Sequence, residues 1–338
     1  MTCNSVWRVI LRVVSAVRAV AAHRSKKQPG LEAALVEAET GGDPEGKARY
    51  TRSSLRSLAT RLGSGCATTV GRLLKPLGYS LKTNVKRLIG KVHPQRDYPY
   101  RLIQRVRGRF IRRGQPVISV DAKKAELIGN FKNAGQRYCR QADPVKAYDF
   151  PSEAQYKAIP YGIYDPVAHH AFVNVGLSAA TPEFAVASIR QWWLRVGQGR
   201  YPLSHSLLIE ADAGGGNGHR PRLWKWGLQQ LADETGLAIT VCHYPSGASK
   251  WNPIEHRLFS QISRNWAGHP LRSLAVMLGF IRGTTTENGL RVEAALDTAI
   301  YEKGIKVSQQ DRETLNIRRR RRCPDLGYTI RPRKAGSS

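Results

Sequence analysis

Two aspartates each end an apolar run of the sequence, and their carboxylates could carry out metal-dependent chemistry. Asp121 closes PVISVD and Asp212 closes SLLIEAD. Both runs are typical of buried strands, and open α/β sheets bind ligands where their strands end. If the two strands are neighbours, the carboxylates converge and, with a third acid, could hold two divalent cations such as Mg²⁺, which prefers oxygen ligands and supports phosphodiester chemistry. Each aspartate alone also fits an ordinary turn at a strand end.

A third acid, Glu255, lies in SKWNPIEHRLF, which predicts the first turns of a helix. Asn252 is a favoured N-cap, a proline follows at the first helical position, and Glu255 then occupies the third position of a capping box. Phe259 and Ile262 share the helix face of Glu255, and this face is expected to pack on a sheet. A buried carboxylate needs a partner, which a metal ion would provide. On these residues alone, capping and metal binding both remain open.

Other polar residues near these strands favour structural roles. Glu210 shares a strand face with Asp212 but does not close an apolar run, and Asp165 precedes a proline, as turn residues do. The run AGGGNG after Asp212 lacks the Gly-Lys-Ser/Thr ending of a phosphate loop and therefore predicts a flexible turn. We interpret His243 and His256 as structural residues.

The runs around these acids predict an α/β domain. Five stretches have the composition of strands, and two stretches between them have apolar residues at helical spacing. The order is three strands, helix, strand, helix, strand and a final helix, which predicts a mixed sheet with helices on its faces. The strand stretches are PVISVD, AIPYGIYD, HAFVNVGL, SLLIEAD and LAITVCHY, and the helical stretches are TPEFAVASIRQWWLRVG and RLWKWGLQQLADETG.

A helix, a tight turn and a second helix are predicted upstream of the sheet, within residues 53–78. Leucines recur at helical spacing from Leu55 to Leu62, a Gly-Ser-Gly turn follows, and apolar residues then resume at the same spacing. With Arg72 and Lys75 on its second helix, the segment fits a helix-turn-helix whose recognition helix enters the DNA major groove. A plain helical hairpin fits the same pattern.

The charge distribution indicates a polyanionic partner. The 338 residues carry a formal net charge of +29, from 54 Lys and Arg against 25 Asp and Glu. Residues 1–116 hold 24 basic and 6 acidic side chains, residues 312–334 hold 9 and 2, and the middle, 117–311, holds 21 and 17. Basic ends around a balanced core are typical of nucleic-acid-binding arms, although basic tails without a specific partner give the same pattern. We interpret the run RRRRR at 318–322 as a solvated tail that acts through its charge.

The cysteines and the hydropathy pattern limit the setting. Five cysteines without a C-x-x-C pair argue against a disulfide framework and a thiolate zinc site, which favours a reduced, cytoplasmic setting. Arginines interrupt the apolar segment near the N-terminus, so no membrane span is predicted.

Five blocks of the sequence resemble the Rhodopirellula-type DDE transposases of bacterial insertion sequences, also called the ISAzo-type family. The blocks are ISVDAKKAELIGNFKN, AIPYGIYD, LLIEADAGGGNG, LADETGLAITVCHYPSGASKWNPIEHRLFSQIS and KGIKVS, and the match runs from about residue 31 to 308. The resemblance implies an RNase H-like mixed five-stranded sheet flanked by helices, preceded by an all-helical helix-turn-helix region. Carried over residue by residue, the family's acidic trio falls on Asp121, Asp212 and Glu255, which are 91 and 43 residues apart.

The resemblance also implies cofactors and partners. The trio would hold two Mg²⁺ ions, with Mn²⁺ as an alternative, while the enzyme cleaves the ends of an insertion sequence and joins them to target DNA. Its partners would be the double-stranded terminal repeats, the target DNA and further copies of the chain in a synaptic complex, with no membrane, at the bacterial nucleoid. Lys123, Lys124 and the basic ends would hold phosphates.

The expected organisation has five parts. They are a basic N-terminal segment (1–30), a helix-turn-helix DNA-binding region (31–92), a linker (93–116), the RNase H-like catalytic domain (117–275) and a C-terminal extension with a basic tail (276–338). Two rival functions remain. One is an RNase H-like nuclease that cleaves without joining, and the other is a non-enzymatic or catalytically degenerate DNA-binding protein that uses the helix-turn-helix.

Overall fold

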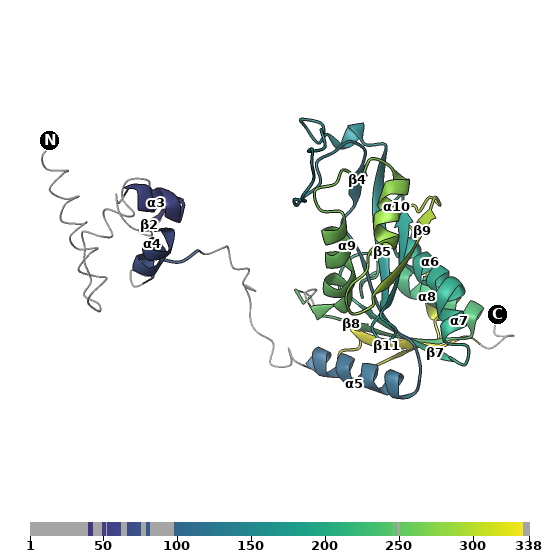
Figure 1. The fold of residues 1–338 in the computed structure, drawn as a ribbon. Helices are drawn as coiled ribbons and strands as arrows, with labels where there is room; N and C mark the ends of the chain where they lie inside the picture. Colours follow the sequence, from purple (N-terminus) through teal and green to yellow (C-terminus); the bar gives the residue numbers. More distant parts are fainter. Residues whose placement is uncertain are drawn as a thin grey trace, which may run out of the picture. The chain divides into compact units, whose positions relative to one another are not determined.

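The computed structural model describes residues 40–42, 49–51, 53–61, 66–75, 79–81, 98–245, 247–248 and 251–333. The chain divides into two units, Met1–Leu88 and Ile89–Ser338 (Figure 1). The expected N-terminal segment, 1–30, lies outside the described residues. Within these ranges, no helix is both long and apolar enough to cross a membrane.

The first unit contains the two predicted helices, α3 (Leu55–Arg61) and α4 (Ala67–Leu74). Ser54 caps α3, because its Oγ accepts a hydrogen bond from the backbone N–H of Ser57 at 3.1 Å. Leu58 and Val70 are buried, as the helical spacing predicts. The unit also contains a hairpin of two three-residue strands, β1 (Thr40–Gly42) and β2 (Arg49–Thr51), which the sequence analysis did not predict.

A mixed sheet forms the centre of the second unit. Its strands follow the order β10-β11-β8-β7-β3-β5-β6-β9, and β4 pairs with β5 beside this path. The strands are β3 (Val117–Ala122), β4 (Glu126–Ile128), β5 (Tyr156–Asp165), β6 (His170–Gly176), β7 (Ser206–Ala211), β8 (Ala238–His243), β9 (Arg291–Asp297), β10 (Ile317–Arg319) and β11 (Gly327–Ile330).

The predicted five-stranded core is β8-β7-β3-β5-β6. Strands β3, β7 and β8 are parallel, whereas β5 is antiparallel to both β3 and β6. This order and these directions are those of an RNase H-like sheet. Beyond the predicted core, β9 extends it past β6, and β11 and β10 extend it past β8.

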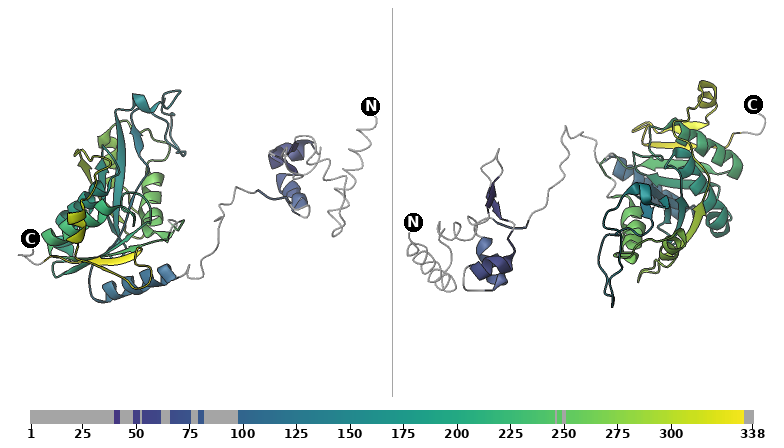
Figure 2. Two further views of the ribbon diagram at one scale, coloured as in Figure 1. Left: turned by 180° about the vertical axis from the view of Figure 1, so that it is seen from behind. Right: turned by 90° about the horizontal axis from the view of Figure 1, so that it is seen from above.

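Helices cover both faces of this sheet, as Figures 1 and 2 show. Alternate residues of a strand face opposite sides, so Ile118 and Ile209 pack in one core with the helices α6 and α8, whereas Val117 and Leu208 pack in another with α5. The segment η5–α9 and helix α10 pack on β5 and β6 in a third cluster. The helical elements are α5 (Tyr98–Arg112), η2 (Pro151–Glu153), α6 (Pro182–Trp192), η3 (Trp193–Gly197), α7 (Gln198–Arg200), α8 (Arg222–Thr235), η5 (Glu255–Phe259), α9 (Ser260–Asn265), α10 (Leu274–Arg282) and α11 (Gln309–Glu313).

Two expected boundaries differ from the structure. The expected linker, 93–116, includes α5, whose Leu102, Ile103 and Val106 are buried against the sheet. Arg101, Arg105 and Arg107 lie next to these residues and conceal their helical spacing in the sequence. The expected extension, 276–338, contributes β9, β10 and β11 to the sheet, so it belongs to the body of the second unit.

Candidate active site

The three predicted acids come from three elements that meet at one edge of the sheet. Asp121 lies near the end of β3, Asp212 directly follows β7, and Glu255 begins η5. Strands β3 and β7 are parallel with Val120 opposite Ala211, so both end at the same edge. The charges of both Asp212 and Glu255 act on Asp121 and raise its pKa, so the three carboxyl groups lie near one another. The structure therefore brings together residues that are far apart in the sequence.

The charges of these acids are poorly compensated. Burial, the negative charge of Asp212 and the neighbouring Glu255 raise the pKa of Asp121 to about 8, against the lowering effect of the Ala122 backbone N–H. That N–H donates to Asp121 Oδ1 at 2.8 Å. Burial and the charge of Glu255 also raise the pKa of Asp212, whereas a hydrogen bond from Asn252 lowers it. A cation at this edge would relieve the repulsion.

The residues fit a divalent cation in ligand type and charge. All three are carboxylates, which hard cations such as Mg²⁺ prefer, and burial together with the charges of Asp212 and Glu255 raises the pKa of Asp121. In the described part of the chain, however, no three His, Cys, Asp or Glu side chains are arranged as a formed metal site. The ligand types are therefore in place, whereas the ligand geometry is not formed.

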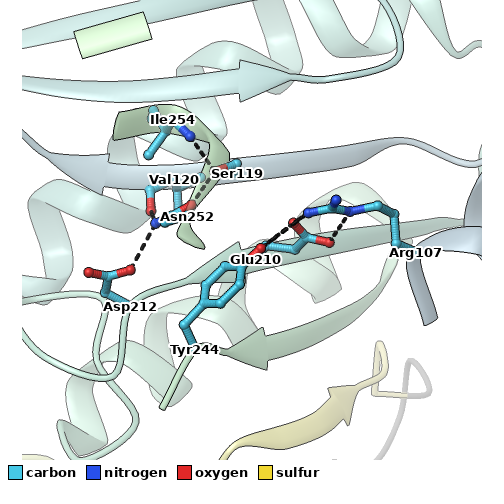
Figure 3. Close-up of polar contacts among 8 residues, drawn as sticks. All are labelled: Arg107, Ser119, Val120, Glu210, Asp212, Tyr244, Asn252 and Ile254. Atoms are coloured by element: carbon cyan, nitrogen blue, oxygen red, sulfur yellow. Dashed lines mark hydrogen bonds and ion pairs between the residues drawn. The ribbon is translucent and has the colours of Figure 1, made fainter. Parts of the chain in front are cut away.

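A buried polar cluster connects the three elements that carry the acids (Figure 3). Asn252 Nδ2 donates to Asp212 Oδ1 at 3.0 Å and to the Val120 carbonyl at 3.4 Å. Its Oδ1 accepts from Ser119 Oγ, which in turn accepts from the Ile254 N–H at 3.2 Å. Ser119 and Asn252 are both completely buried, at 0% exposure. The pair thus connects β3, the residue after β7 and the helical segment that begins before η5.

The same contacts decide the capping question at the start of that helix. Asn252 precedes the first helical turn, and its carbonyl accepts from the Glu255 N–H at 3.2 Å. Among the described contacts, neither side chain makes the reciprocal bonds of a capping box. Asn252 binds β3 and Asp212 instead, and Glu255 acts on the pKa of Asp121. The sequence pattern correctly placed Asn252 at the start of a helix, but it did not predict the partners of the Asn252 and Glu255 side chains.

Glu210 lies two residues before Asp212 and has a different environment. It is fully buried, accepts from Arg107 Nε of α5 at 2.7 Å and from the Tyr244 hydroxyl at 3.2 Å, and forms an ion pair with a second guanidinium nitrogen of Arg107 (Figure 3). Burial alone would lower the pKa of Arg107, and the paired Glu210 more than offsets this effect. The interpretation of Glu210 as a structural acid is consistent with these contacts.

A family model described as Rhodopirellula transposase DDE domain matches residues 31–332. The chain belongs to this family. It is therefore a DDE transposase, an enzyme that cleaves and transfers DNA strands. Enzymes of this type use divalent metal ions and bind DNA. A search of curated proteins gives no match.

Among solved structures, the transposase is similar to three Mos1 complexes. The "Mos1 transposase paired-end complex with left transposon end" is 16% identical with a TM-score of 0.37, and the alignment covers 81% of this chain and 77% of that chain. The "Crystal structure of the Mos1 Strand Transfer Complex" is 15% identical with a TM-score of 0.40, covering 83% and 78%. The "Crystal structure of the Mos1 mariner paired end complex with Mn" is 16% identical with a TM-score of 0.38, covering 81% and 77%.

The predicted phosphate-binding residues of the transposase have different surroundings. Lys123 forms an ion pair with Glu126 and lies over the Trp266 ring at 5.0 Å, so its charge is already engaged. Lys124, three residues after Asp121 in the sequence, is exposed. Arg72 lies on α4 and Lys75 directly follows that helix, and both are exposed in the first unit.

His243 connects the sheet edge that carries Asp212 to the C-terminal strands. Its Nδ1 lies 3.0 Å from the Asp212 carbonyl and its Nε2 lies 3.2 Å from the Tyr328 hydroxyl. Burial lowers the pKa of His243 to about 4, so the ring is neutral at pH 7. This agrees with a structural histidine. Sequence reasoning missed its partner Tyr328, and it also missed Ser119, because both contacts depend on residues distant in the chain.

Proposed function

We propose that Asp121, Asp212 and Glu255 are the catalytic acids of this transposase. The observation that supports the assignment is the convergence of three carboxylates from β3, β7 and η5 at one sheet edge, where burial and mutual repulsion raise the pKa of Asp121. Carboxylates at such an edge are suited to divalent cations. Glu210 is excluded from this role because its carboxylate is occupied by Arg107.

The proposed reaction has two in-line displacements without a covalent protein intermediate. Water first attacks the phosphodiester at the end of the element, which breaks the bond to the 3′ oxygen and leaves a 3′ hydroxyl on the element and a 5′ phosphate on the other fragment. That hydroxyl then attacks a phosphodiester of the target DNA, and the 3′ oxygen of the target strand leaves as a hydroxyl. Asp121 and Asp212 would hold two Mg²⁺ ions, or Mn²⁺, and Glu255 would complete the second site. When bound, such ions activate the attacking oxygen and stabilise the leaving oxygen.

Asn252 and Ser119 would position these ligands. Asn252 donates to one oxygen of Asp212, which restricts the orientation of this carboxylate. Ser119 holds both Asn252 and the backbone at Ile254, one residue before Glu255. Hydrogen bonds behind metal ligands of this kind typically orient the ligands and tune the site.

We assign recognition of the terminal repeats to residues 31–92. The supporting feature is α4, which carries the exposed Arg72 and is followed directly by the exposed Lys75. Leu58 of α3 and Val70 of α4 are buried in the same unit. A fragment covering 93–338 should retain affinity for any duplex and lose its preference for the repeat in a competition binding assay. Equal preference by the fragment would refute the assignment. The functional complex would contain further copies of the chain, each bound to one element end.

The test of the function is an assay with purified chain, Mg²⁺ and DNA that carries the element's own terminal repeats. The expected products are a 3′-hydroxyl element end and that end joined to a second duplex. Cleavage without joining would support a nuclease instead. Binding that is equal in Mg²⁺ and in chelator, without any cleavage, would support a non-enzymatic DNA-binding protein.

A further inference from the structure

A basic groove of about 600 Å³ lies between α5 and the C-terminal hairpin β10–β11. These strands, drawn in yellow, lie beside α5 in Figures 1 and 2. Two exposed arginines of α5, Arg105 and Arg109, line one side. The run 318–322 and Arg331 line the other side, so eight arginines surround the groove. Among the described residues that line it, none is acidic.

The arginine run is held in place by the hairpin. Strand β10 pairs with β11, and β11 pairs with β8. Tyr328 of β11 is completely buried, and its hydroxyl accepts from Trp224 Nε1 at 2.9 Å. The interpretation of 318–322 as a solvated tail is therefore wrong for its structure, because β11 supplies the apolar anchor that the run itself lacks.

The guanidinium groups of the groove have few anionic partners. Among the described residues, Arg319 has a carboxylate partner, Asp325, at 3.3 Å, and no other groove arginine forms such a pair. Arg320 Nε is buried and has no acceptor among the described residues. Arg322 lies over the Tyr98 ring at 5.5 Å, which orients its guanidinium. A positioned cluster of like charges needs an anion from outside the chain.

The groove reaches the edge of the sheet that carries the catalytic acids. Gly327 of β11 lies opposite Cys242 of β8, and His243 of β8 lies opposite Ala211 of β7. The turn from Arg320 to Leu326 therefore lies at the same edge as Asp212, and the His243 N–H donates to the Leu326 carbonyl at 2.7 Å.

We propose that this arginine groove holds the phosphate backbone of the target duplex during joining, an inference that rests on the proposed transposase function. Arginine binds phosphate oxygens through a planar fork of donors. Contacts to phosphates carry no sequence information, which suits a target that has no terminal repeat. Recognition of the repeat itself needs base contacts, which we assign to the first unit.

The test uses the full chain with four exposed groove arginines changed to Gln, at 105, 109, 321 and 322. A matched control changes four exposed arginines elsewhere in the second unit, at 140, 195, 200 and 291. Joining is measured with element ends that already carry a 3′ hydroxyl, while the concentration of a repeat-free target duplex is varied. The groove variant should need at least about tenfold more target for half-maximal joining, and the control should shift far less. The proposal would be overturned if both variants needed the same increase in target concentration. It would also be overturned if the groove variant joined more slowly at saturating target while its half-maximal target concentration stayed unchanged.

A binding measurement separates this proposal from the proposed function, since it needs no catalysis. In chelator, binding of the repeat-free duplex by the groove variant should lose about 0.9 of its log–log salt slope for each phosphate contact removed. Lys at the same four positions keeps the charge and should restore the slope. An unchanged slope in the Gln variant, or no recovery with Lys, would refute phosphate contact by the groove. Normal binding behaviour together with no cleavage by the parent chain would instead refute the transposase assignment alone.

Discussion

The proposed catalytic acids and the arginine groove lie at the same edge of one sheet, and each gathers charges of one sign. In the same unit, Arg107 of α5 and Glu210 of β7 bring opposite charges together in a pair whose side chains are 20% and 0% exposed. The pair and the two clusters differ in the source of the opposite charge. Glu210 finds its partner within the chain, whereas the acids and the groove arginines lack sufficient partners among the described residues, as the raised pKa of Asp121 and the unsatisfied Arg320 Nε show. Charges left unpaired at a defined position point to ligands, here a cation and a polyanion.

The position of α5 makes this contrast possible. One helix turns Arg107 inward to Glu210 and presents Arg105 and Arg109 to the groove. Val106, between Arg105 and Arg107 in the chain, and Leu102, one turn earlier, are buried against the sheet. The same helix therefore stabilises the sheet beneath the acids and forms one wall of the groove.

The largest expected effect is the loss of catalysis when one charge of the acidic cluster is removed. Glu255→Gln keeps the shape and a hydrogen-bonding side chain, so a capping residue would tolerate it, but it removes charge from the proposed metal site. Cleavage and joining should fall by more than about a hundredfold, since even groups behind metal ligands typically contribute 10–100-fold.

Glu302→Gln, a change at an exposed glutamate of the same unit, is the matched control and should retain activity. Asp121→Asn and Asp212→Asn should behave like Glu255→Gln, and double variants should lose little more than single ones, because groups that act as a unit are not additive. Strand transfer by Glu255→Gln at the parent rate would contradict the assignment.

The second effect concerns the paired charges. Glu210→Gln leaves the Arg107 guanidinium without its carboxylate in a buried position, so the free energy of unfolding should fall by about 3 kcal/mol. Glu234→Gln is the control, because Glu234 pairs with Arg190 at the surface and such pairs contribute about 1 kcal/mol or less. Urea denaturation of both variants in chelator measures the difference. Equal losses would show that the Arg107–Glu210 pair is not a buried structural contact.

The third effect concerns the polar cluster behind the acids. Asn252→Ala frees Asp212 and leaves Ser119 Oγ without an acceptor, so activity should fall by about 10–100-fold. Asn252→Asp restores an acceptor for Ser119 but adds a negative charge beside Asp212, and it should not rescue activity. A positioning role also predicts weaker Mg²⁺ binding by Asn252→Ala, measured by calorimetry without DNA. Unchanged Mg²⁺ affinity would limit Asn252 to a structural role.

The sequence was enough to propose the acids, but it did not predict the residues that hold them in position. Asp121 and Asp212 could be found because each closes an apolar run, and the period of two along β3 and β7 then determines their face. The role of Asn252 could not be predicted, since its local signal is that of a cap and its partner Ser119 lies 133 residues earlier in the chain. The groove was missed for the same reason, because β10 is three residues long and its anchor is on the next strand. Local patterns therefore identified individual residues, whereas the pairing of distant segments determined which of them meet.

The smallest expected effect is a change in melting temperature. Its sign should differ between loss of the unpaired acid Asp121 and loss of the paired acid Glu210. The pKa of Asp121 in the folded chain is raised to about 8, above its ordinary value of 3.8, so the folded state binds more protons than the unfolded state between these values. In chelator, the stability of the parent should therefore fall as pH rises from about 4 to about 8, and the loss should be complete above that window.

The Asp121→Asn variant lacks this repulsion. At pH 8 in chelator its melting temperature should exceed that of the parent by at least about 2 °C, which corresponds to about 1 kcal/mol in a unit of this size. In Mg²⁺ the parent should have the higher melting temperature, because the ion stabilises a folded state that it binds. The Asp121→Asn variant lacks one of the ligands and should gain less from the ion. Glu210→Gln removes a carboxylate from the same sheet edge and should lower the melting temperature under both conditions. A lower melting temperature for Asp121→Asn in chelator would show that Asp121 is compensated within the chain, as Glu210 is, and the contrast between paired and unpaired charge at this edge would not hold.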